Sequence, residues 1–260
     1  MRQVGNTANQ FDEISPVYDE TREPLKGTTV NKIESILLRD SCKSIIEVGV
    51  GTGRVAKPLQ DRGFEIVGLD ISKGMIHKAR EKNVHGLILA EANHLPIKNK
   101  SFDAALFAHV LHIFEDPTQV LREVSNLVRK DVIALVRKRD GGSRESANGN
   151  KMLWQMLQEA SARVGYALPI RAGGRRRKES DLLTVFPPDE LIEIQDELIE
   201  TSIDERLSYF EKRAFRPILG IPNDTLQKII GEVRSSLPAE ALAKKIHYRR
   251  IDQMAIWKFH

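Results

Sequence analysis

Short apolar runs alternate with helical patterns along the first 140 residues of the chain. The runs are rich in Ile, Val and Leu, as in strands that are buried on both faces of a sheet. Between them, apolar residues recur at the spacing of a helix, and cap residues mark several of the ends. The expected strands are 44–50, 65–70, 86–92, 102–109 and 131–136, and the expected helices are 27–38, 54–62, 72–83 and 117–128.

Cap residues support these boundaries. Gly63 follows the second expected helix at the position where helices end in a glycine. Ser72 stands where it can cap the next helix, and Pro117 opens the last one in its first turn. Five alternations of strand and helix predict an α/β fold, in which a parallel sheet carries helices on both faces.

The pattern changes after Arg139. A polar, glycine-rich stretch at 141–149 predicts a loop or a lid. Beyond it we expect helices at 151–164, 187–196, 204–215 and 223–236, and strands at 198–203 and 253–259. The late strands are expected to complete the sheet. The chain is therefore divided into an N-terminal helical lead at 1–40, a core at 41–140 and a helical cover at 141–260, all within one structural domain.

Composition adds few constraints. The chain has 260 residues, of which 41% are hydrophobic and 29% charged, as in a globular protein. A net charge of +4 permits an anionic partner without requiring one. The dense basic cluster at 175–178 is either a solvated loop or a site for nucleic acid or phosphate.

Several classes of protein are disfavoured. No apolar run approaches the roughly 18–20 residues of a membrane span, and the first 19 residues lack the apolar core of a signal peptide. Cys42 is the only cysteine, so no intramolecular disulfide is expected, which favours a cytoplasmic location. One cysteine and seven scattered histidines give no metal-ligand spacing, so we expect no metal.

The most informative stretch is the glycine-rich turn after the first strand. Gly49, Gly51 and Gly53 lie where open α/β sheets bind nucleotides. A dinucleotide fingerprint would place its third glycine at position 54, which is Arg54. Glu47 adds a carboxylate at the strand end, which would repel a pyrophosphate and attract a ligand that carries an ammonium and a sulfonium group.

Two further acidic residues follow the next two strands. Asp70 ends the second strand, where a carboxylate can accept hydrogen bonds from both ribose hydroxyls. Alternatively, it is simply a carboxylate favoured by the following helix N-terminus. Glu91 ends the third strand, where it could face an adenine edge or merely meet solvent.

These pieces occur in the order and spacing of a known family. The segments Glu47–Gly53, Gly68–Met75, Glu91–Pro96 and Ser101–His112 resemble those of class I S-adenosylmethionine-dependent methyltransferases, of the type found in ubiquinone and menaquinone biosynthesis. The resemblance runs from about Tyr18 to Arg139, half of the chain. It implies S-adenosylmethionine as cofactor and a Rossmann-like, doubly wound, mostly parallel seven-stranded sheet with helices on both faces and extra C-terminal helices.

The resemblance also implies roles for individual residues. The glycine turn would hold the methionine part of the cofactor with Glu47 near its ammonium group, and Asp70 would take the ribose hydroxyls. The N-terminal lead would fold over the cofactor as a lid, with Arg22 pairing with its carboxylate or lying on the surface. The implied cofactor-binding residues are Tyr18, Arg22, Glu47, Gly49, Val50, Gly51, Gly53, Asp70, Ile71, Met75, Glu91, Ala92, Asn93, Ala108 and His109.

Methyl transfer needs a general base only when the acceptor carries a proton of high pKa. His109 and His112 are the candidates, because strand four ends near the cofactor in this family; alternatively both only line the pocket. No RNA-binding module is appended, which favours a small-molecule acceptor, and we expect a monomer or a homodimer. Trp154, Met152 and Met156 either line an apolar acceptor pocket or belong to the core.

Three other functions stay open. The basic cluster at 175–178 would serve a methyltransferase that acts on RNA, and protein is a further possible acceptor. A nicotinamide dehydrogenase is disfavoured by the glycine spacing and by Glu47. A protein that binds S-adenosylmethionine without catalysis would share every feature of the cofactor site.

Overall fold

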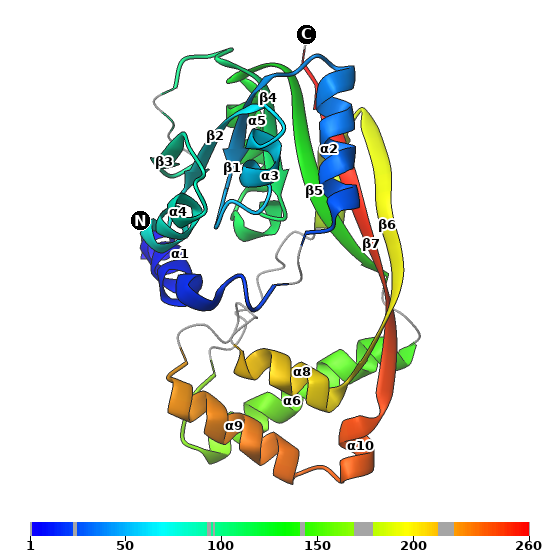
Figure 1. Ribbon diagram of the computed structural model, residues 1–260. Helices are drawn as coiled ribbons and strands as arrows, with labels where there is room; N and C mark the ends of the chain where they lie inside the picture. Colours follow the sequence, from blue (N-terminus) through cyan, green and yellow to red (C-terminus); the bar gives the residue numbers. More distant parts are fainter. Residues whose placement is uncertain are drawn as a thin grey trace. The chain divides into compact units, whose positions relative to one another are not determined.

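The computed structural model describes residues 2–22, 25–92, 95, 97–140, 144–168, 179–212 and 221–259 (Figure 1). Its strands form one seven-stranded sheet in the order β3-β2-β1-β4-β5-β7-β6. The strands are β1 (Ser44–Val48), β2 (Glu65–Asp70), β3 (Leu87–Leu89), β4 (Phe102–Ala108), β5 (Val128–Asp140), β6 (Glu190–Ser202) and β7 (Lys245–Lys258).

Helices precede, connect and follow these strands. They are α1 (Arg2–Ile14), α2 (Gly27–Arg39), α3 (Ala56–Gln60), α4 (Lys73–Glu81), α5 (Pro117–Ser125), α6 (Arg144–Arg163), α7 (Glu179–Val185), α8 (Ile203–Glu211), α9 (Asn223–Ser235) and α10 (Ala239–Ala243), with 3-10 turns η1 (Ser15–Val17) and η2 (Leu111–Ile113).

Most of the sheet is parallel. β1 pairs in parallel with β2 and β4, β2 with β3, and β4 with β5. β7 runs the other way: the Phe259 amide donates to the Lys130 carbonyl at 2.6 Å, whereas Arg137, further along β5, pairs with Asp252, earlier in β7. The mostly parallel, doubly wound sheet with extra C-terminal helices confirms the predicted fold class.

The chain divides into two compact units. The first comprises Met1–Lys138, Arg176–Gln195 and Asp252–His260, and the second comprises Arg139–Arg175 and Asp196–Ile251. β6 and β7 contribute residues to both units. The lead, core and cover expected from the sequence stay a prediction.

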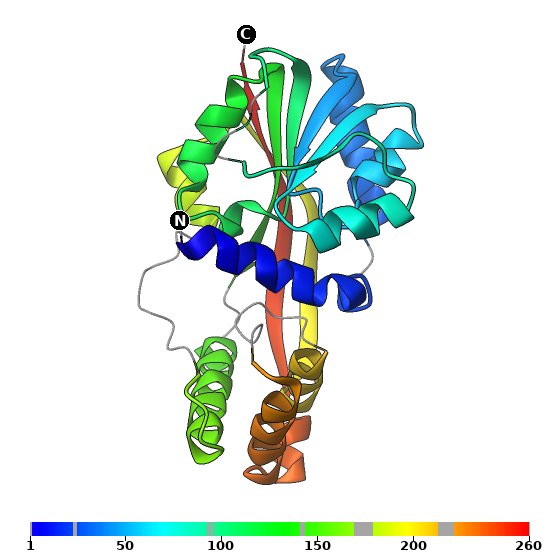
Figure 2. The same ribbon diagram turned by 90° about the vertical axis from the view of Figure 1, so that its left-hand side faces the viewer.

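In the first unit the sheet separates two layers of apolar side chains. Successive residues of a strand face opposite layers. Ile45 on β1 and Leu106 on β4 pack with α2, α3 and α4, whereas the residues that follow them, Ile46 and Phe107, pack with α5 and α7. Figure 2 shows α2 and α5 on opposite sides of the sheet. All four of these strand side chains are 0–1% exposed, which explains why the parallel strands have apolar sequences without a polar period.

The helix expected at 187–196 is wrong, because this segment begins β6. Two prolines followed by Asp189 are compatible with the start of a helix, so the local sequence does not exclude a helix here. In the fold, Ile192 and Ile194 lie two residues apart and pack against the core of the first unit, while β7 supplies backbone partners. Tertiary pairing therefore overrides local propensity here.

Other boundaries also move. α6 begins at Arg144, so the loop expected at 141–149 is wrong from 144 onwards, and 141–143 lie outside the described residues. β5 and β7 are longer than predicted, and β3 is shorter. The residues that lengthen β5 and β7 are mostly polar, so the apolar pattern marks only the part of each strand that lies in the core.

The second unit has its own core. Leu157, Leu207 and Ile230 on α6, α8 and α9 are at most 2% exposed. Trp154 and Met156 are partly buried against this core, which favours a packing role for both. Across the part of the chain that is described, no helix combines the length and apolarity that a bilayer crossing requires.

Polar side chains join the elements of the second unit. Ser202 and Glu205 form a reciprocal capping box at the start of α8. Arg234 on α9 binds two carboxylates of α8, Asp204 at 2.8 Å and Glu211. Along the β6–β7 pair, Arg250 meets Glu197 at 2.6 Å. Of these contacts, those of Arg234 join two helices, α8 and α9.

Candidate cofactor site

The glycine turn between β1 and α3 depends on residues without a Cβ. Gly49, Gly51 and Gly53 have φ values of +74°, +55° and +77°, which glycine adopts most readily. A Cβ at Gly49 would lie 2.6 Å from a Val110 methyl group, and one at Gly53 would lie 2.5 Å from a Val84 methyl group. The turn is therefore packed between the segments that follow β4 and α4.

Hydrogen bonds tie this turn to the end of β2. The amides of Gly49 and Val50 both donate to the Leu69 carbonyl, at 2.8 and 2.9 Å. The Gly51 amide donates to Asp70 Oδ2 at 2.9 Å, and the Ser72 amide donates to Asp70 Oδ1 at 2.9 Å. Asp70 thus holds both loops that form the predicted site.

Burial raises the pKa of Asp70, although these backbone hydrogen bonds oppose the shift. Glu47 is more extreme, since its side chain is 1% exposed. Burial raises the pKa of Glu47 well above its usual range, and the nearby Asp70 charge adds to the shift. One Glu47 oxygen accepts a hydrogen bond from the Ala56 amide, whereas Oε2 has no partner among the described residues.

The ends of β3 and β4 lie beside this turn. The Ala90 amide donates to the Asp70 carbonyl at 3.0 Å, which places Glu91 and Ala92 next to the end of β2. Phe107 is in register with Val48, so Ala108 lies next to the glycine turn. Of the other predicted contacts, Ile71 is half-buried, Met75 is 2% exposed, and Asn93 lies outside the described residues.

The two candidate histidines differ in environment. His109 follows β4 directly, has a φ of +56° and donates its amide to the Leu135 carbonyl at 3.3 Å. A non-glycine residue in this conformation is strained, and such strain gathers at functional sites. His109 is half-buried and precedes Val110, which packs on Gly49, whereas His112 lies exposed on η2.

The N-terminal lead reaches the same loops. The Arg22 guanidinium lies 4.8 Å from the Tyr18 ring centre, a cation–π contact. Asp19 Oδ1 accepts a hydrogen bond from the Thr52 hydroxyl at 2.6 Å, and Asp19 Oδ2 pairs with Lys82 at 2.5 Å.

The residues that make these attachments carry little distinctive signal in the sequence. Asp19 lies inside the Tyr18–Arg22 segment, which is a signal that could have found it. No local pattern distinguishes Lys82, which pairs with Asp19, or Asp12, whose carboxylate accepts a hydrogen bond from the Ser72 hydroxyl at 2.6 Å. The basic cluster at 175–178 lies outside the described residues.

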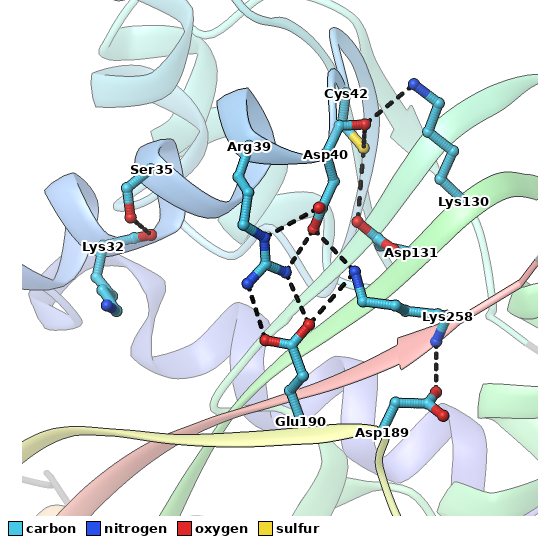
Figure 3. A network of polar contacts seen from close by, with 10 residues as sticks. All are labelled: Lys32, Ser35, Arg39, Asp40, Cys42, Lys130, Asp131, Asp189, Glu190 and Lys258. Carbon is cyan, nitrogen blue, oxygen red and sulfur yellow. Dashed lines mark hydrogen bonds and ion pairs between the residues drawn. The ribbon is translucent and has the colours of Figure 1, made fainter.

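A second polar cluster lies at the other end of the parallel strands (Figure 3). Asp40 follows α2 and binds Arg39 at 2.6 Å and Lys258 at 3.3 Å. Glu190 also binds both of these cations, at 2.8 and 3.3 Å. Asp131, 2% exposed on β5, accepts a contact from the Cys42 thiol at 3.7 Å. The cluster joins α2, β5, β6 and β7.

Comparison with known proteins agrees with the geometry. Residues 46–136 match the family described as methyltransferase domain. An uncharacterized protein of Methanocaldococcus jannaschii is 30% identical over 122 residues, covering 47% of this chain and 57% of that protein. Demethylmenaquinone methyltransferase of Renibacterium salmoninarum is 28% identical over 129 residues, covering 47% and 54%. The chain thus spans little more than half the length of these curated relatives.

Solved structures share the fold. The YcgJ protein of Bacillus subtilis aligns with a TM-score of 0.53 at 18% identity, covering 88% of this chain and 99% of that one. The cyclase SpnF aligns with a TM-score of 0.51 at 15% identity, covering 96% and 95%. At such identities the likeness shows the fold alone.

The family match and the sheet define a class. Residues 46–136 carry a methyltransferase domain, of the S-adenosylmethionine-dependent class that the motifs predicted. S-adenosylmethionine is the cofactor of this family. The chemistry of the site fits that group, because Glu47 Oε2, which is buried and has no partner within the described part of the chain, can receive a cation.

Proposed function

We propose that this protein transfers a methyl group from S-adenosylmethionine to a small-molecule acceptor. The observation that carries the proposal is the pair of buried carboxylates, Glu47 and Asp70, on either side of the glycine turn. Each burial is unfavourable for a negative charge, and a positively charged ligand would offset that cost. The ammonium and sulfonium groups of S-adenosylmethionine supply such charge, whereas a pyrophosphate would be repelled.

The hydrogen-bonding capacity of Asp70 supports a ribose site. Each of its carboxylate oxygens accepts a backbone donor, from Gly51 or from Ser72, and retains a lone pair. Two ribose hydroxyls can donate to those lone pairs. In this proposal Glu91 and Ala92, beside the end of β2, contact the adenine, and the turn at Gly49 contacts the amino-acid part.

The bound cofactor supplies a methyl group on a good leaving group. The contribution of the chain is then to hold the acceptor in line with that methyl group, and such alignment can supply roughly 7–11 kcal/mol of a barrier. His109 would accept a proton from an acceptor hydroxyl or amine whose pKa is high. Its strained backbone and half-buried side chain are typical of a residue that serves function rather than stability.

A small-molecule acceptor is supported by the names of relatives. Demethylmenaquinone methyltransferase, the name of the Renibacterium salmoninarum relative, denotes an enzyme that acts on demethylmenaquinone. We therefore place a small molecule with a hydroxyl, amine or carbon nucleophile first among acceptor classes. Methylation of RNA or protein, and cofactor binding without turnover, are the alternatives that the tests below distinguish.

The first test is isothermal titration calorimetry with S-adenosylhomocysteine. Wild type should bind with micromolar Kd, and Asp70→Asn should weaken binding at least about tenfold, or about 1.4 kcal/mol. Asp131→Asn is the matched control, because it removes another buried carboxylate at the opposite end of the strands and should leave Kd unchanged. Failure of folded wild type to bind, or equal binding of NADH, would contradict the proposal.

The second test measures S-adenosylhomocysteine formation with a panel of quinols and phenols, total RNA and a peptide mixture. Turnover on a small molecule, reduced in His109→Gln, is expected. Turnover on RNA or peptide alone would refute the small-molecule assignment. Tight cofactor binding without turnover on any member would refute catalysis on these acceptor classes.

A further inference from the structure

A carboxylate of α1 caps the helix that follows the ribose-binding aspartate. Asp12 Oδ1 accepts hydrogen bonds from the Ser72 hydroxyl at 2.6 Å and from the Gly74 amide at 2.8 Å. The Ser72 side chain is fully buried, and its own amide donates to Asp70. A single serine therefore connects α1 with Asp70.

The approach of α1 to α4 requires a glycine. A Cβ at Gly74 would lie 2.3 Å from the Ser15 hydroxyl oxygen and 3.2 Å from Asp12 Cα. Figure 1 shows α1 beside α4. A side chain at position 74 would force Ser15 to move and would press on the Asp12 backbone, so the missing Cβ of Gly74 allows this close approach.

A second carboxylate attaches the same segment to the glycine turn. Asp19 binds the Thr52 hydroxyl and Lys82, and Lys82 also donates to Thr52 at 3.1 Å. Thr52 is 1% exposed and lies between Gly51 and Gly53. Burial alone would raise the pKa of Asp19, but the hydrogen bonds from Lys82 and Thr52 outweigh it and lower the pKa.

We infer that Asp12 and Asp19 are positioning residues that hold the segment 12–22 against both cofactor-binding loops, so that the cofactor leaves slowly. The inference rests on the proposed function. Each attachment point, Ser72 or Thr52, lies within two residues of a proposed cofactor contact. Removing an attachment should loosen one of the loops that contact the cofactor. The resulting loss of affinity should appear mainly as a faster dissociation of the cofactor.

The test is surface plasmon resonance of S-adenosylhomocysteine on the immobilised full chain. Asp19→Asn and Asp12→Asn should each raise the dissociation rate about five- to tenfold and leave the association rate within about twofold. Glu20→Gln is the matched control, because it removes an exposed charge next to Asp19 and should match wild type. Thermal unfolding of each variant verifies that the chain is folded.

Conservative changes separate positioning from general structure. Thr52→Ser keeps the hydroxyl and should retain the wild-type dissociation rate, whereas Thr52→Val should resemble Asp19→Asn. Adding Lys82→Met to Asp19→Asn should have little further effect, because both residues act through one attachment.

The outcomes distinguish the inference from the proposed function. If folded wild type binds no S-adenosylhomocysteine, the proposed function is wrong. If wild type binds and folded Asp12→Asn and Asp19→Asn release the ligand at the wild-type rate, the positioning role is wrong and the cofactor site stands. If Asp19→Asn fails to fold, the Thr52 pair decides: equal dissociation rates of Thr52→Ser and Thr52→Val refute the role of Asp19. If Asp12→Asn fails to fold, Ser72→Ala, which removes the hydroxyl that donates to Asp12, decides: a wild-type dissociation rate refutes the role of Asp12.

Discussion

Asp131 should make the protein less stable at neutral pH than at mildly acidic pH. Burial raises the pKa of Asp131 to about 6, and the negative charge of Asp40 adds to the shift, while Lys258 opposes it. The neighbouring Asp40, bonded first of all to Arg39, has its pKa lowered to about 2. Between these values the folded protein keeps the proton on Asp131 (Figure 3).

The size of the effect follows from the shift. The ordinary pKa of 3.8 rises to about 6 on folding, and about 1.4 kcal/mol per pH unit then gives about 3 kcal/mol. Because the folded state binds this proton more tightly than the unfolded chain, the stabilisation is fully present below pH 3.8 and is lost as pH rises through about 6. Carboxylates with lowered pKa values, such as Asp103, contribute the opposite dependence at lower pH.

Asp131→Asn isolates this contribution, because an amide resembles the protonated acid at every pH. The variant should match wild type near pH 4 and should exceed its free energy of unfolding by up to about 3 kcal/mol near pH 7. Urea unfolding should be followed by Trp257 fluorescence in a Trp154→Phe background, since Trp257 belongs to the core of the first unit. Glu193→Gln, an exposed change on β6, is the control.

A difference between Asp131→Asn and wild type that does not vary between pH 4 and pH 7 would refute this reasoning. So would an Asn variant that is less stable than wild type at pH 7. Either result would show that the proton is not held at Asp131, and that the cations of the cluster compensate both carboxylates.

Three further predictions concern single positions. Gly49→Ala should lower the melting temperature more than Gly51→Ala, because a Cβ at Gly49 meets Val110 whereas one at Gly51 meets open space. Adding Val110→Ala to Gly49→Ala should restore part of the lost melting temperature. Equal losses for the two glycine variants by calorimetry would contradict this. Cys42 is 3% exposed, and burial raises the pKa of its thiol to about 12. It should therefore react with Ellman's reagent at least about a hundredfold more slowly in native than in unfolded protein. Rapid labelling of the native protein would count against the burial of Cys42. His109→Gly should be about 1 kcal/mol more stable than His109→Ala in urea, because glycine relieves the left-handed φ of +56°, and the reverse order would exclude backbone strain there.

Local signals along the chain were sufficient to predict the parallel part of the sheet and the glycine turn after β1. Ser72 accepts a hydrogen bond from the Met75 amide as the predicted helix cap, and Pro117 opens α5. Gly49, Gly51 and Gly53 adopt the positive φ values that a turn of this kind requires. Such features depend on interactions between residues that are close in sequence, so their pattern is visible without a fold.

Tertiary structure decided what depends on distant segments. The strand at Glu190–Ser202 forms because β7 pairs with it, against a local helical signal. Asp12 acquires its role from Ser72, 60 residues away, and Asp131 acquires its raised pKa from Asp40 and from burial. The amino-acid sequence by itself determined the α/β class, the motifs of the methyltransferase domain and the glycine turn, because period, caps and glycines are local. Packing decided which carboxylates are buried, which lie near another charge, and which bind the N-terminal segment to the loops. Burial and the proximity of charges exist only once the chain has folded.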